Sequence, residues 1–442
     1  MELGILFLVI LGIIIATVRF KIHPVFSLTA AAILCGLAFG LSPEKVMSTL
    51  SEGFGKTLSG IGLVIAFGTI IGTFLEKSGG TKILAHKLLQ WVGLSKSPLA
   101  LNLAGLIISI PVYCDSGFVI LSSLNTALSK RSGIKIFVFA IALATGLYSA
   151  HVFIPPTPGP LAAAAILEAD LGLVMLFGIV VALAVSLSGY GWALFMGNKL
   201  TSIEKATMEG NEPGEIEKIE GPAFGLVLLP LVLPLVLIAL RSVAEYPTLP
   251  FGEGSLAKAL VFLGHPILAL FLGTIASFWL VPRNEKKSQP SWIKSALKQA
   301  GAIVLITGAG GAFGAILRTL DFESLLQIGA ANGIGGLCLA FGIAAVLKTA
   351  QGSSTVSIIT TAAIIAPLLT AFGLVGLTEK ALVVLAIGAG AMTVSHVNDS
   401  YFWVVAEFSK MDMKTALRGH TMATLVQGIT GIVVILGMYL LF

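Results

Sequence analysis

Five ionisable side chains stand inside long apolar stretches of the sequence, where a charge is expensive and usually serves a function. These side chains are Asp115, His151, Lys348, His396 and Asp399. Histidine changes charge near neutral pH, and an aspartate removed from water holds its proton longer, so the acids and histidines are candidate proton carriers. Lys348 has two possible roles: it holds a carboxylate ligand, or it pairs within the protein with Asp115 or Asp399.

These residues belong to four polar stretches that interrupt apolar segments: PVYCDSG at 111–117, YSAHVFIPPTPGP at 148–160, KTAQGSST at 348–355 and SHVNDS at 395–400. Proline breaks a helix, and broken backbone inside a bilayer is tolerated only where protein buries it or where it lines a watery cavity. Amides at broken helix ends bind anions, while hydroxyl and amide side chains bind hydroxyl groups. The stretches therefore predict a site near the middle of the membrane for a small hydroxylated anion.

The predicted binding residues come from all four stretches. They are Asp115, Ser116, Gly117, His151, Thr157, Lys348, Gln351, Gly352, Ser353, Ser354, Thr355, Ser395, His396 and Asn398. The predicted proton carriers are Asp115, His151, His396 and Asp399. The alternative for His151 and His396 is a structural hydrogen bond from the ring to a carbonyl of a broken helix.

The elements that position these residues are membrane helices. Of 442 residues, 56% are hydrophobic and 11% charged, against about 25% charged in soluble domains, and the mean hydropathy is +0.98. The net charge of +5 fits cytoplasmic loops enriched in Lys and Arg rather than nucleic-acid binding. The three cysteines suggest neither disulfides nor zinc, and no HExxH or Walker motif occurs, so no metal, cofactor or ATP use is expected. The remaining histidines, His420 among them, are expected at span ends or on a surface helix.

The two halves of the chain resemble each other. Gly68, Gly72 and Leu75 recur as Gly310, Gly314 and Leu317, and the polar stretches recur in the same order, at an offset of roughly 240 residues. We therefore expect one repeat over 1–197 and another over 223–442, joined by a cytoplasmic linker at 198–222. Each repeat contains a hairpin, at about 97–128 or 334–372, and a broken helix, at about 136–167 or 381–409.

Loop charges predict the orientation. Lys96 precedes the first hairpin and Lys130, Arg131 and Lys135 follow it, so both of its ends are expected in the cytoplasm. The second hairpin has no such basic flanks, as an inverted repeat entering from the opposite side requires. This predicts an all-α polytopic protein with about ten spans, two re-entrant hairpins and both termini in the periplasm. The alternative is that each hairpin forms two thin spans.

At this point the sequence resembles the gluconate permease family of bacterial proton symporters. The matching stretches are VYCDSG at 112–117, HVFIPPTPGP at 151–160, KTAQGSSTVS at 348–357 and SHVNDSYFW at 395–403. The resemblance covers essentially the whole chain. It implies discontinuous helices at the binding site, an elevator-like mechanism, a homodimer, and uptake of sugar acids with protons. Members carry gluconate, related aldonates and hexuronates, glycerate-like acids or D-serine.

We therefore expect a transporter of the bacterial inner membrane, not an enzyme, that imports gluconate or a related small sugar acid with protons. A D-serine or glycerate permease of the same fold is the first alternative, and an anion channel is an alternative of another class. A third alternative is an intramembrane enzyme, for which Ser353 and His396 could be proposed, but the sequence shows no evident nucleophile–base pair. Sodium as the coupling ion stays open.

Overall fold

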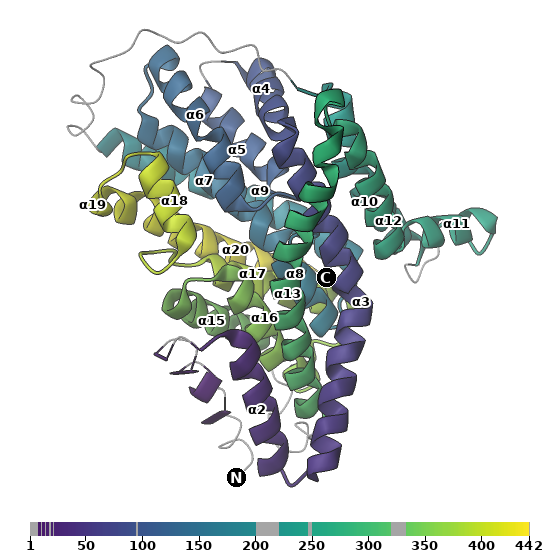
Figure 1. The fold of residues 1–442 in the computed structure, drawn as a ribbon. Coiled ribbons are helices and arrows are strands. Elements are labelled where there is room, and N and C mark those ends of the chain that lie inside the picture. Colours follow the sequence, from purple (N-terminus) through teal and green to yellow (C-terminus); the bar gives the residue numbers. More distant parts are fainter. Residues whose placement is uncertain are drawn as a thin grey trace.

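The computed structural model describes residues 8–9, 11–13, 15–16, 19–20, 22–93, 96–199, 221–245, 250–319 and 333–441. Within these ranges every regular element is a helix (Figure 1). Of the apolar run at 3–18 only residues 8–9, 11–13 and 15–16 are described, and of the predicted linker at 198–222 only residues 198–199 and 221–222.

Seven of the described helical segments are long and apolar enough to cross a membrane. An eighth is added if the pair Ser255–Leu263 and Pro266–Leu280, bent by 66°, counts as one span. The chain is therefore an all-helical, multi-pass membrane protein, as predicted. The total of about ten spans stays a prediction.

The helices of the first half follow one another closely. They are α2 (Pro24–Ala38), α3 (Pro43–Lys77), α4 (Gly80–Val92), α5 (Ser97–Ile108), α6 (Cys114–Ser132), α7 (Ile136–Phe153), α8 (Pro158–Ile166) and α9 (Leu171–Lys199). Those of the second half are α10 (Phe224–Ala244), α11 (Ser255–Leu263), α12 (Pro266–Ser277), η3 (Phe278–Leu280), η4 (Arg283–Ser288), α13 (Gln289–Leu317), α15 (Gly333–Gln351), α16 (Ser354–Ile365), η5 (Ala366–Leu368), α17 (Leu377–Met392), α18 (Ser400–Phe408), α19 (Met413–Ala416), η6 (Leu417–Thr421) and α20 (Met422–Leu441).

Each polar stretch separates two helices, for a local reason. Between α7 and α8 the prolines of the Ile154–Thr157 break cannot donate backbone hydrogen bonds, and Pro158 then occupies the first turn of α8. Between α15 and α16 Gly352 takes the left-handed conformation (φ +85°), and the Ser353 hydroxyl caps α16 by accepting from the amide of Val356 (3.3 Å). The Asp399 carboxylate likewise caps α18 by accepting from the amide of Tyr401.

The long helix α3 packs along α13, and α10 packs against α12 (Figure 1). At the centre of the other helices lies α7, which is buried along almost its whole length and packs against α5, α6 and α9. Helix α11 projects from the far end of α10 and α12, away from α7 (Figure 1).

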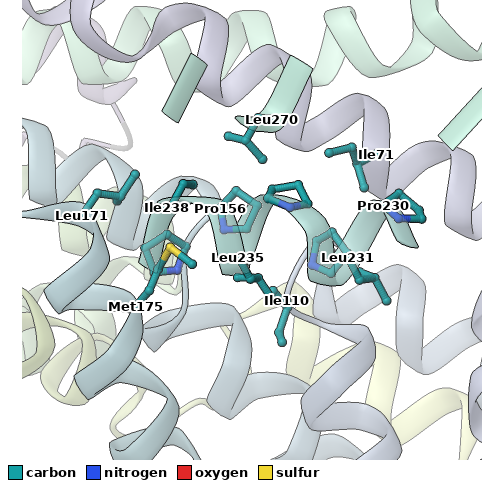
Figure 2. A pocket seen from close by; sticks show the side chains of 13 residues that line it. Ile71, Ile110, Pro156, Leu171, Met175, Pro230, Leu231, Leu235, Ile238 and Leu270 are labelled. Atoms are coloured by element: carbon teal, nitrogen blue, oxygen red, sulfur yellow. The ribbon is translucent and has the colours of Figure 1, made fainter. Parts of the chain in front are cut away.

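An apolar gap lies between α10 and two of the helix breaks. Figure 2 shows Ile110 and Pro156, from the breaks, around the same gap as Pro230 and Leu235 of α10. Helix α3 approaches the breaks through glycines. A Cβ added at Gly72 would overlap the backbone carbonyl of Pro111, and one at Gly68 would lie 3.1 Å from the Pro156 Cβ. Close packing through small residues is typical of membrane helices.

Candidate functional site

A polar cavity of about 280 Å³ lies where the four helix breaks meet. Its lining residues are Tyr113, Cys114, Asp115, Tyr148, His151, Gln351, Gly352, Ser353, Ser354, Thr355, Asn398, Asp399, Ser400 and Tyr401. They come from segments separated by almost 300 positions in the sequence, so only the tertiary fold brings them together.

Most of the predicted site residues line this cavity. The cavity contains Asp115, His151, Gln351, Gly352, Ser353, Ser354, Thr355, Asn398 and Asp399 from the predicted set, while Ser116, Gly117, Thr157, Lys348, Ser395 and His396 do not line it. Gly117 packs against Leu147, and the Thr157 hydroxyl donates to the carbonyl of Ile154 within its own break. These two residues shape the breaks instead of facing the cavity.

Lys348 is fully buried behind the wall. Its ammonium donates to the carbonyl of Gly352 and to Oδ2 of Asp399. Of the two roles left open by the sequence, the structure therefore contains the internal pair. Both partners line the cavity, so the Lys348 charge lies directly behind residues of the cavity lining.

Asp399 has every partner that a buried carboxylate needs. Its Oδ2 accepts from Lys348 and from the hydroxyl of Ser395, and its Oδ1 accepts from the amide of Tyr401 (3.0 Å). The Ser395 hydroxyl also lies 3.1 Å from Nε2 of His420. A connected chain of polar groups thus runs from Lys348 through Asp399 and Ser395 to His420.

The prediction that His420 lies at a span end or on a surface helix is wrong. This residue is fully buried in η6, a π-helical turn between α19 and α20, and its ring lies 5.3 Å from that of Tyr401. The sequence suggested a span end because Lys414 and Arg418 precede it. The π turn and its packing against the broken helices are tertiary features that no local pattern predicted.

His396 takes the structural role that the sequence analysis left open. Its Nε2 lies 2.8 Å from the carbonyl oxygen of Thr349, near the end of α15, and the side-chain amide of Asn398 donates to the same oxygen. His151 differs, because it lines the cavity and its Nδ1 has no hydrogen-bond partner in the described ranges. Of the two predicted histidines, His151 is therefore the one that lines the cavity.

Several lining residues were missed by the sequence analysis, although each lies within or beside a polar stretch. Tyr148 is fully buried and bonds through its hydroxyl to that of Ser354 (2.6 Å), which joins α7 to α16. Tyr401 donates to the carbonyl of Ala144 (2.9 Å), and its ring centroid is 5.2 Å from that of Tyr148. Cys114 lies beside Asp115, with 3.8 Å between its sulfur and Oδ2. Tyrosines next to the breaks are the signal that could have identified them.

Three helices begin at the cavity wall. Helix α6 starts at Cys114, α16 at Ser354 and α18 at Ser400, and these first residues line the cavity. Exposed amides and the positive end of the helix dipole make such an end favourable for an anion. In the described part of the chain the wall's charged side chains are Asp115 and Asp399, with Lys348 behind them. No group of three His, Cys, Asp or Glu side chains within those ranges could hold a metal ion.

An all-helical membrane protein with a polar cavity at the breaks of discontinuous helices has the construction of a secondary transporter. A model of the GntP family of permeases matches residues 1–441. The chain belongs to this family of transporters, which are permeases and not enzymes.

Curated bacterial relatives match along almost their whole length. The chain is 32% identical over 433 residues to a gluconate permease of Pseudomonas aeruginosa, covering 97% of this chain and 95% of the relative. It is 30% identical to the high-affinity gluconate transporter of Escherichia coli K12 (98% of each chain) and 30% identical to the D-serine transporter DsdX of the same strain (97% and 95%). Together with the apolar helices, these relatives indicate a multi-pass protein of the inner membrane.

A solved structure shares the fold. The YdaH transporter of Alcanivorax borkumensis superposes with a TM-score of 0.65, over 95% of this chain and 98% of that one, at 13% identity. At this identity the similarity shows the architecture alone, which is that of a membrane transporter.

Proposed function

We propose that this permease imports gluconate, or a related small sugar acid, together with protons. The observation that carries the proposal is the composition of the cavity wall. Three helix N-termini, hydroxyl and amide side chains, and two carboxylates surround a volume suited to a small hydroxylated acid.

The uncharged groups match a polyol chain. Gln351, Ser353, Thr355 and Asn398 present amide and hydroxyl groups along the wall, and each of these groups can donate to or accept from a hydroxyl. A cavity of about 280 Å³ lies near the lower end of the range for small-molecule sites, about 300–1,000 Å³. The cargo is therefore a small molecule with several hydroxyl groups.

The charges on the wall favour proton coupling. An anion entering beside ionised Asp115 would be repelled, and two like charges 4 Å apart repel by about 4 kcal/mol at an effective dielectric constant of about 20. That repulsion corresponds to a loss of roughly a thousandfold in affinity. Protonation of a wall carboxylate removes it, so proton and anion bind together. Asp115, His151 and Asp399 are the proton carriers that the wall offers.

We infer the remaining architecture from the order of the helices. The pairs α5–α6 and α7–α8 of the first half correspond to α15–α16 and α17–α18 of the second half. This order supports two inverted repeats over 1–197 and 223–442. The family resemblance implies in addition that the helices carrying the breaks move as an elevator past α3, α10 and α13 in a homodimer, and the loop charges favour termini that face the periplasm.

The test is uptake of labelled gluconate into proteoliposomes, with and without an inward-directed pH gradient. Gradient-dependent accumulation above equilibrium, displaced by unlabelled gluconate, is the expected result. Downhill flux alone would contradict coupling and favour a channel or uniporter. A sodium gradient that drives accumulation in the absence of a pH gradient would contradict the choice of proton.

D-Serine is the second candidate substrate, and the two wall carboxylates favour it. The ammonium group of D-serine would pair with Asp115 or Asp399, which a gluconate molecule cannot do. Competition decides between them: unlabelled D-serine at excess should leave gluconate uptake unchanged if the sugar acid is the cargo. Gradient-driven uptake that only D-serine displaces would retain the coupling and change the substrate.

A further inference from the structure

We propose that Asp399 is a built-in competitor of the substrate for Lys348. In the empty, deprotonated site the Asp399 carboxylate forms an ion pair with the Lys348 ammonium. When Asp399 takes up a proton, the carboxylate of the substrate replaces it there. The inference rests on the proposed function and specifies where the proton and the carboxylate bind.

The position of Lys348 is the first support. Its ammonium contacts the Gly352 carbonyl and the Asp399 carboxylate and lies 5.7 Å from the ring centroid of Tyr148. All three partners line the cavity, while Lys348 itself has no exposed surface. The ammonium is therefore covered by residues that line the cavity, and the Asp399 carboxylate is the ionised group among them.

The second support is the balance of charge. With Asp399 ionised, the pair is neutral and a bound anion adds one uncompensated negative charge to a buried site. With the proton on Asp399, the Lys348–Asp399 ion pair is replaced by an ion pair between Lys348 and the substrate carboxylate. The charge at Lys348 is again compensated, and one proton accompanies one substrate. A buried ammonium left without a partner would be strongly unfavourable, so the proton alone does not complete the exchange.

Several titratable groups face Asp399, and the test must separate them. Lys348 comes from α15, Cys114 and Asp115 from α6, Tyr148 and His151 from α7, Tyr401 from α18 itself, and His420 from η6. Of these, Lys348 contacts the carboxylate directly, and His420 reaches it through Ser395. Asp115 is the second acid on the wall and the main competitor for the role.

The experiment measures equilibrium binding of labelled gluconate to purified protein between pH 5.5 and 8, without any gradient. In the wild type we expect the affinity to fall by up to about tenfold per pH unit as the pH rises, because one proton is linked to one ligand. The Asp399→Asn variant should bind with an affinity that no longer depends on pH in this way. Asparagine retains the cap of α18.

Asp412→Asn is the matched control. Asp412 is also an N-cap, accepting from the amide of Thr415 (3.1 Å), but it is exposed and does not line the cavity. Its variant should retain the wild-type pH dependence. If Asp399→Asn also retains it, or if Asp115→Asn abolishes it instead, the inference is wrong.

Two further variants keep the test decisive if Asp399→Asn folds poorly. Ser395→Ala leaves the ion pair in place and removes a hydrogen bond that stabilises ionised Asp399, so the fall in affinity should move up by about one pH unit. The double variant Lys348→Gln with Asp399→Asn removes both charges and should not bind gluconate. An unmoved profile for Ser395→Ala, or wild-type affinity in the double variant, would overturn the exchange. Failure of the wild type to bind gluconate, D-serine or glycerate would instead overturn the proposed function.

Discussion

Gly72 provides a direct test of how the breaks are held against α3. The structure leaves no space for a side chain there: a Cβ at this position would overlap the carbonyl oxygen of Pro111 and lie 3.1 Å from its carbonyl carbon. Because the neighbour is backbone and not a flexible side chain, Gly72→Ala requires α3 or the break to shift. Overpacking of this kind costs about 1–3 kcal/mol.

Gly62 in the same helix is the matched control, because a Cβ there meets nothing within 4 Å. Both substitutions change glycine to alanine inside α3, so the gain in helix propensity, about 1 kcal/mol, cancels when the two are compared. We expect Gly72→Ala to be less stable than Gly62→Ala by about 1–3 kcal/mol, which lowers the melting temperature by a few degrees. The difference in melting temperature is measured by heating the detergent-purified variants and determining the fraction that stays folded by size-exclusion chromatography. Equal melting temperatures would refute the close contact between α3 and the break at Pro111.

Three further predictions follow from other parts of the fold. A membrane-permeant maleimide should label Cys114 more slowly when substrate fills the cavity, whereas labelling of the exposed Cys338, read by mass spectrometry, should not change. Asn102→Ala should destabilise the protein by about 1–3 kcal/mol in a thermal melt, because Asn102 is fully buried and makes four hydrogen bonds between α5, α7 and α9. The hydrogen bond from Lys56 lowers the pKa of Glu168 at the surface. Ionised Glu168 therefore adds less than about 1 kcal/mol to the free energy of unfolding; this stabilisation is present above the ordinary pKa of 4.5 and is lost as the pH falls through the lowered pKa. Wild type and Glu168→Gln should therefore differ in melting temperature at pH 7 and converge once the pH falls below the lowered pKa; a difference that persists in strong acid would contradict this.

The class of protein and the location of the breaks could both be predicted from the amino-acid sequence. Its low content of charge requires membrane helices, since so much apolar surface must be removed from water. Prolines, Gly352 and the caps Ser353 and Asp399 end or begin helices through their own backbone and side-chain chemistry, which acts over a few residues. The polar stretches could therefore be located from the sequence, and most of the cavity wall with them.

The contacts between the polar groups, in contrast, could not be predicted from the sequence and are seen only in the folded protein. Lys348 had three possible partners in the sequence, and the fold brings it into contact with Asp399, the N-cap of α18. His420 looked like a residue at a span end, but the π turn of η6 places it against Ser395. His396 looked like a proton carrier, but it is held by the carbonyl of Thr349. Such contacts join residues tens of positions apart, and their energies depend on burial and geometry that local sequence patterns do not contain.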